Sequence, residues 1–104
     1  MSYRYTVTAR FTSPIVAEEW VEWLLDEHCE AVIRAGAIRA EIVAMDTPPL
    51  EFDVRYDFAN REAFEDYERT YAATLRDEGL ALFPPSRGIA YARTMGSLRQ
   101  IIGR

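Results

Sequence analysis

Apolar and polar positions follow two different periods along the chain, and the changes of period mark the expected elements. Residues 3–12 and 51–58 alternate strictly between apolar and polar side chains, which is typical of half-buried strands. Residues 37–46 and 88–95 are expected to form two further strands. Between them lie two segments in which apolar residues recur at helical spacing.

The first helix is expected from Ile15 to Ala35, with both tryptophans on its apolar arc and acidic residues opposite. Ser13-Pro14 suits an N-cap followed by proline in the first turn, and Gly36 suits the helix end.

Asn60 is expected to cap the second helix. We expect this helix to bend or restart near Gly79 before Pro84-Pro85 stops it. Its apolar stripe is narrower and consists of Phe64, Tyr67, Tyr71 and Leu75.

The order strand-helix-strand-strand-helix-strand predicts an α+β, ferredoxin-like sandwich that takes up residues 1–104 as a single domain. In this fold the first and third strands are central in a four-stranded antiparallel sheet, and both helices cover the same face. The other face of the sheet is left bare.

The bare face is expected to carry the polar side chains of the two alternating strands. These are Arg4, Thr6, Thr8, Arg10, Asp53, Arg55 and Asp57. If the small residues of the last strand face the helices, the larger ones join the bare face: Ile89, Tyr91, Arg93 and Met95. A solvated sheet with cross-strand ion pairs is one interpretation. The other is a homodimer in which two such faces meet, with the apolar tail crossing the seam.

Charge narrows the range of partners. The net charge is −5 with a pI near 4.8, and all positive charges are arginines. This balance argues against nucleic-acid and anionic-membrane partners. The N-terminal residues do not resemble a signal peptide and no apolar run is long enough for a membrane helix, so a cytoplasmic location is expected.

His28 is the single histidine and falls on the apolar arc of the first helix. In one interpretation it is a general base at the edge of a cavity, oriented by Glu27, while Arg93 holds an oxyanion. In the other, His28 is a core histidine satisfied by a backbone carbonyl, and Glu27 extends to solvent at the rim.

Aromatic residues offer a second candidate site. Trp20, Trp23 and Tyr91 are the expected contacts for a small apolar or aromatic compound, although an aromatic stripe at helical spacing is more typical of a core than of a binding site. No metal or cofactor is expected, because there is one histidine and no glycine-rich phosphate loop. Cys29 lies near acidic residues, which disfavours a reactive thiolate.

A series of short motifs resembles an uncharacterised family of short bacterial proteins, a domain of unknown function within the dimeric α-β barrel superfamily. The motifs are Trp20-x-x-Trp23, Glu27-His28, Gly36, Arg61-Glu62, Leu75-Arg76-x-Glu78-Gly79-Leu80 and Gly88…Arg93-Thr94. The resemblance implies ferredoxin-like protomers paired through their sheets. The superfamily includes cofactor-free monooxygenases, cyclases and haem-degrading enzymes. The haem-degrading branch needs a histidine on the second helix, which this chain lacks.

We therefore expect a homodimer of unassigned role that binds a small apolar or aromatic compound. The alternatives are a cofactor-independent monooxygenase or polyketide-type cyclase that uses His28, and a non-catalytic interaction module. A cavity that reaches His28 would favour the enzyme, whereas a cavity filled by side chains would favour the module.

Overall fold

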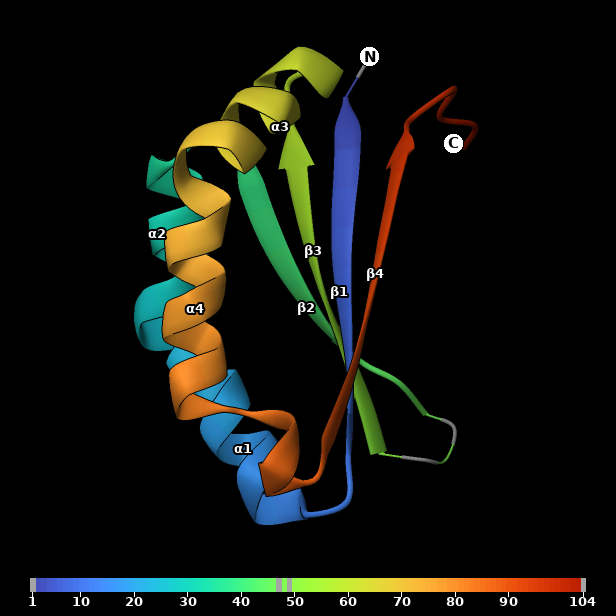
Figure 1. Ribbon diagram of the computed structural model, residues 1–104. Helices are drawn as coiled ribbons and strands as arrows, with labels where there is room; N and C mark the ends of the chain where they lie inside the picture. Colours follow the sequence, from blue (N-terminus) through green and yellow to red (C-terminus); the bar gives the residue numbers. More distant parts are fainter. Residues whose placement is uncertain (1, 47, 49, 104) are drawn as a thin grey trace.

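The computed structural model describes residues 2–46, 48 and 50–103, and its elements follow the predicted βαββαβ order. The four strands form one antiparallel sheet in the order β2-β3-β1-β4 (Figure 1), so the first and third strands are central, as predicted. Their bounds are β1 Tyr3–Phe11, β2 Arg39–Ala44, β3 Leu50–Phe58 and β4 Ile89–Ser97.

The first helix is a single rod built from α1 (Pro14–Trp23), a π-helical turn η1 (Leu24–His28) and α2 (Cys29–Arg34). The Ser13 hydroxyl accepts a hydrogen bond from the Val16 N–H at 3.4 Å, which caps the free N–H groups of the first turn. The chain leaves the helix at Gly36, whose φ of 135° favours glycine.

The second helix has the same construction, with α3 (Arg61–Tyr67), a π-helical turn η2 (Glu68–Ala72) and α4 (Ala73–Leu82). The predicted break near Gly79 is wrong, because α4 continues through it to Leu82. Gly79 serves close packing instead: a Cβ at this position would lie 3.0 Å from the Trp23 indole. A short 3-10 turn, η3 (Pro85–Arg87), then leads into β4.

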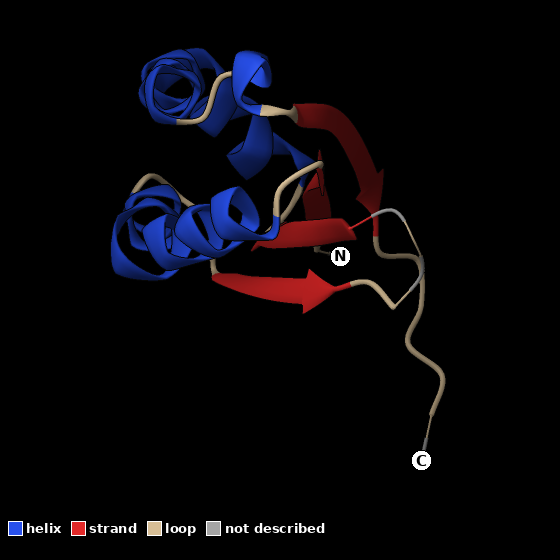
Figure 2. Cartoon of the chain, turned by 90° about the horizontal axis from the view of Figure 1, so that it is seen from below, coloured by secondary structure: helices blue, strands red, loops and turns tan. Residues whose placement is uncertain are grey.

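Both helices lie on the same side of the sheet (Figures 1 and 2), and the buried residues of the core pack between these two layers. The largest fully buried side chains come from central strand β3 (Val54, Tyr56 and Phe58) and from the first helix (Leu24 and Val32), because the helix layer covers this face of the sheet. Tyr71, predicted to belong to the helix stripe, is 48% exposed and lies outside the core. In the described part of the chain no helix is long and apolar enough to cross a membrane.

The expected orientation of β4 is wrong. In the sheet register Arg93 pairs with Val7 and Tyr91 pairs with Ala9, so these two side chains share the helix-facing side with the apolar residues of β1. The two helices cover the helix-facing side of edge strand β4 only in part. Long amphipathic side chains such as Tyr91 and Arg93 can cover the rest of this side while their polar ends reach solvent. The small residues of the strand lie on the bare face instead: Ala90, Ala92, Thr94 and Gly96.

Candidate functional site

A pocket of about 210 Å³ lies between the two helices and the helix-facing side of the sheet. Strands β1, β3 and β4 form its floor, and the rods α1-η1-α2 and α3-η2-α4 form its walls. Most of its lining is apolar or aromatic, which is usual for a small-molecule site. The lining residues are Tyr5, Val7, Trp20, Trp23, Leu24, His28, Val54, Tyr56, Tyr67, Ala72, Leu75, Arg76, Gly79, Leu80, Tyr91 and Arg93.

All five site residues suggested by the sequence lie in the wall of this one pocket. Trp20 is almost fully buried on α1, and Trp23 is partly buried one turn further along. Tyr91 enters from β4, where its hydroxyl donates to the Phe83 carbonyl at 2.8 Å. Burial raises the pKa of Tyr91 to about 12, so its phenol remains protonated at neutral pH.

His28 is stacked on the Trp23 indole, with ring centroids 4.3 Å apart and planes 20° from parallel. Burial lowers the pKa of His28 to about 4, so the imidazole is neutral near pH 7. Among the described residues, none forms a hydrogen bond with its ring nitrogens, so the bond to a backbone carbonyl expected for a core histidine is absent. Glu27 is exposed and lines a neighbouring groove with His28 and Trp23, but it does not bind the imidazole, contrary to the interpretation in which it orients the ring.

Arg93 lies at the edge of the pocket next to Tyr5. Its Nε donates to the Tyr5 hydroxyl at 3.0 Å, and its guanidinium lies 5.0 Å from the centre of the Tyr5 ring. A second bond runs from Nη2 to Glu68 Oε1 at 2.5 Å. Burial opposes the charge of Arg93, but its contacts with Tyr5 and Glu68 outweigh this effect and raise its pKa.

Two π-helical turns face the pocket from opposite helices. Leu24 and His28 of η1 line it, and so does Ala72 of η2. A π turn widens the helix by one residue and rotates the side chains that follow, and such turns are frequent at functional sites. Periodicity at 100° per residue does not reveal these turns, although it correctly places His28 on the same face as Trp20 and Trp23.

Several pocket residues were not singled out by sequence reasoning. The periodicity of the sequence places Tyr5 and Tyr67 in the core, and Arg76 belongs to one of the family motifs, so none of the three is predicted as a site residue. Glu68 and Arg76 lie two turns apart on one helix, so their opposite charges fall on the same helix face. This spacing is the signal in the sequence that could have predicted their contact.

Cys29 lies beside the pocket floor, with its sulfur 3.9 Å from the Tyr56 hydroxyl. Burial raises the pKa of the Cys29 thiol, and this agrees with the expectation that it is not a reactive thiolate.

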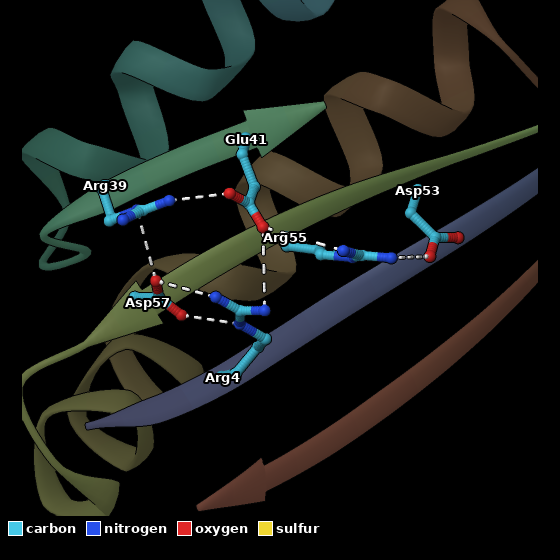
Figure 3. Close-up of polar contacts among 6 residues, drawn as sticks. All are labelled: Arg4, Arg39, Glu41, Asp53, Arg55 and Asp57. Atoms are coloured by element: carbon cyan, nitrogen blue, oxygen red, sulfur yellow. Dashed lines mark hydrogen bonds and ion pairs between the residues drawn. The ribbon is translucent and has the colours of Figure 1, made fainter. Parts of the chain in front are cut away.

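The bare face of the sheet carries a network of ion pairs across three strands (Figure 3). Arg4 donates to both carboxylate oxygens of Asp57, at 2.9 and 3.2 Å, and Arg39 reaches the same carboxylate at 3.4 Å. Arg55 bridges Asp53 at 3.1 Å and Glu41 at 3.8 Å. The network joins the three strands, and its arginines cover Asp53 and Asp57, whose side chains are only 13% and 15% exposed.

The charges of the bare face cancel. It carries four arginines (Arg4, Arg10, Arg39 and Arg55) and four carboxylates (Glu41, Glu51, Asp53 and Asp57). The net charge of −5 therefore resides elsewhere on the molecule. Arg93, expected on this face, does not belong to it.

Within the described residues, no three His, Cys, Asp or Glu side chains gather in a geometry that would hold a metal ion. The arrangement that remains is a neutral imidazole, a set of aromatic rings and two arginines around an unfilled volume. Such a site can bind an apolar compound and exchange a proton with it through the imidazole.

Residues 2–96 match the profile of the family described as "Domain of unknown function (DUF4286)", and the chain belongs to that family. No protein with a curated function shows significant sequence similarity to the chain.

Solved structures share the fold. A dimeric ferredoxin-like protein from an uncultured marine organism has a TM-score of 0.78 at 11% identity, over 97% of this chain and 98% of that chain. A Streptomyces coelicolor monooxygenase, solved with nanaomycin D, has a TM-score of 0.75 at 16% identity, over 99% and 92%. The cofactor-independent oxygenase SnoaB of Streptomyces nogalater has a TM-score of 0.71 at 12% identity, over 99% and 98%. These matches establish a ferredoxin-like fold, which the chain shares with a protein described as dimeric, and a distant structural likeness to such monooxygenases.

Proposed function

We propose that this member of a family without an assigned function binds a small apolar or aromatic compound in the pocket between its helices and sheet. The observation that carries the proposal is the unfilled volume of about 210 Å³ lined by Trp20, Trp23 and Tyr91. A ferredoxin-like core of this size is normally packed to high density, so an unfilled apolar volume needs a reason. The volume also weighs against a module that acts only through its surface.

The test uses the two indole N–H signals, because Trp20 and Trp23 are the two tryptophans of the chain and both line the pocket. On titration with neutral 2-naphthamide, both signals are expected to shift in a saturable manner in two-dimensional NMR spectra. Ala72→Leu fills the pocket and should weaken binding, while Ala81→Leu, the same change at an exposed position of α4, should not. Thermal melting identifies any variant that fails to fold. Equal binding by both variants would place the ligand elsewhere.

The chain is further proposed to act as a homodimer in which two bare faces meet. The support is electrostatic: a neutral face with internally paired charges can approach its own copy without the repulsion that a net charge of −5 would produce. The fold neighbour from the uncultured marine organism is itself described as dimeric.

Light scattering after size-exclusion chromatography tests this assembly. Ala92 lies on the bare face opposite Thr8, so Ala92→Glu places an unpaired charge within the proposed interface. We expect Ala92→Glu to shift the protein toward monomer, and Ala81→Glu on the exposed side of α4 to leave the dimer intact. A wild-type monomer at micromolar concentration would contradict the proposal.

A second candidate function is a cofactor-independent monooxygenase or cyclase that acts on a polyketide-like aromatic compound. It is favoured by the neutral His28 imidazole, which lies in the pocket wall without a hydrogen-bonding partner among the described residues. His28 would accept a proton from an acidic hydroxyl or C–H group of the substrate, and Arg93 would stabilise the resulting anion. Dioxygen would be the co-reactant of the oxygenase.

An oxygen electrode distinguishes the enzyme from a binder. With 1,8-dihydroxyanthrone as the substrate, the enzyme should consume oxygen above the buffer rate, and His28→Phe should abolish this excess while 2-naphthamide binding persists. Oxygen uptake that is unchanged in His28→Phe would rule out the role of the imidazole as the base.

A further inference from the structure

The pocket has an uneven distribution of charge. Among its sixteen lining residues, the two that carry a charge at neutral pH are Arg76 and Arg93, since burial keeps His28 neutral. No carboxylate belongs to the lining. A positive lining is unexpected in a protein whose net charge is −5, and it requires a local explanation.

Both arginines belong to one small cluster with Glu68. Arg93 Nη2 lies 2.5 Å from Glu68 Oε1, and Arg76 Nη2 lies 3.4 Å from Glu68 Oε2. One carboxylate thus serves two guanidinium groups, and the cluster retains one unbalanced positive charge. Each guanidinium has five N–H donors, so most of these donors are not used by Glu68.

The cluster lies at the solvent end of the pocket. The side chains of Arg93 and Arg76 are 36% and 41% exposed, whereas Trp20, which also lines the pocket, is 3% exposed. Tyr5 holds the Arg93 guanidinium in position through a hydrogen bond of 3.0 Å and the face of its ring. The pocket therefore has an apolar, aromatic interior and a cationic mouth with an ordered donor group.

We propose that the pocket selects compounds that combine an apolar aromatic body with an anionic head, of the aryl carboxylate class, and that Arg76 and Arg93 hold the head. This proposal rests on the proposed binding function and specifies its ligand. Guanidinium groups suit the planar carboxylate because two parallel N–H groups can reach its two oxygens. The aromatic body would lie against the Trp20 and Trp23 rings.

Glu68 acts in this arrangement as an internal counter-ion. In the unliganded pocket it neutralises part of the arginine charge, and an incoming carboxylate must share or replace its contacts. Removal of the Glu68 charge should therefore strengthen binding of an anionic ligand, while the affinity for a neutral ligand of the same shape should stay the same.

The experiment compares 2-naphthoate with 2-naphthamide, which have nearly the same shape and differ by the charge of the head group. In isothermal titration calorimetry at pH 7.5 and low salt, the wild type should prefer the carboxylate by tenfold or more. Arg76→Gln and Arg93→Gln should each reduce this preference several-fold, because each lowers the affinity for the carboxylate more than the affinity for the amide. Arg61→Gln removes an equal charge at an exposed position of α3 and should preserve the preference.

Glu68→Gln should raise the affinity for 2-naphthoate several-fold, and added salt should reduce the preference. Glu65→Gln is the matched control, because it changes the net charge by the same amount at an exposed position of α3. An equal gain in affinity in Glu68→Gln and Glu65→Gln would show that the effect comes from the net charge of the protein. It would overturn the assignment of the carboxylate site to the cluster of Arg76, Arg93 and Glu68.

Two further outcomes separate this inference from the proposed function. Equal affinities for 2-naphthoate and 2-naphthamide would overturn the proposal that the pocket selects an anionic head group. The proposal that the pocket binds apolar aromatic compounds would remain. Failure of both compounds to bind would overturn the pocket as a site for small aromatic compounds, and the head-group selection with it. Because Arg76, Arg93 and Glu68 are partly exposed, their amide variants are expected to fold, and thermal melting checks this.

Discussion

Replacement of His28 by phenylalanine removes a titratable group from the pocket wall while it keeps an aromatic ring against Trp23. Burial lowers the pKa of His28 from 6.5 to about 4, so between these values the unfolded chain binds a proton that the folded protein does not. The contribution of the neutral imidazole to the free energy of unfolding is therefore fully present above pH 6.5. It is lost as the pH falls from 6.5 toward 4.

The magnitude follows from the two pKa values. At pH 5.0 the unfolded imidazole is almost fully protonated and the folded one is mostly neutral. With about 1.36 kcal/mol per pKa unit, His28 should lower the free energy of unfolding by about 2 kcal/mol between pH 7.5 and pH 5.0. That is a large part of the stability of a domain of this size.

Urea denaturation at the two pH values, followed by circular dichroism, measures this quantity. The carboxylates near the imidazole, Asp26, Glu27, Glu30 and Glu78, are present in both proteins, so their contribution cancels in the comparison. We expect the wild type to lose about 2 kcal/mol more than His28→Phe over this range. Equal losses would show that the folded imidazole titrates normally and is not desolvated.

Three stability predictions complement this one. Trp20→Ala should cost about 3–5 kcal/mol in chemical denaturation, because Trp20 is 3% exposed and its loss leaves a cavity; Glu18→Ala, at an exposed position of α1, should change little. Gly79→Ala should gain about 1 kcal/mol of helix propensity but place a Cβ 3.0 Å from the Trp23 indole, which is held by His28 and Phe83, so a small net loss is expected; a raised melting temperature would show that the indole gives way. Asn60→Ala should cost about 1 kcal/mol, because the Asn60 side chain accepts from the Ala63 N–H at 2.8 Å; Asn60→Asp should retain most of this stability.

Local signals in the sequence were sufficient for the fold. Strict alternation in residues 3–12 and 51–58 predicted the two central strands, and Ser13 and Asn60 both cap helices in the structure as predicted. These features depend on near neighbours along the chain, and the chain topology follows from the order of the elements. The sheet order β2-β3-β1-β4 was correct for this reason.

The placement of residues around the pocket was predictable only in part. Trp20, Trp23 and His28 share the apolar arc of one helix, and their periodicity was sufficient to bring them together. The side on which Arg93 and Tyr91 lie was predicted incorrectly, because both alternating sets of β4 contain apolar residues. A strand with no dominant apolar face has no local signal for its register.

The amino-acid sequence by itself determined the order and type of the elements and the acidic, lysine-free surface, because these depend on composition and on neighbours three or four positions apart. Tertiary structure decided the rest: pairing with β1 turned Arg93 toward the helices, and Glu68 brought Arg93 and Arg76 together from two different elements. The cluster and the pocket beneath it arise from contacts between segments distant in the chain, and no local pattern encodes them.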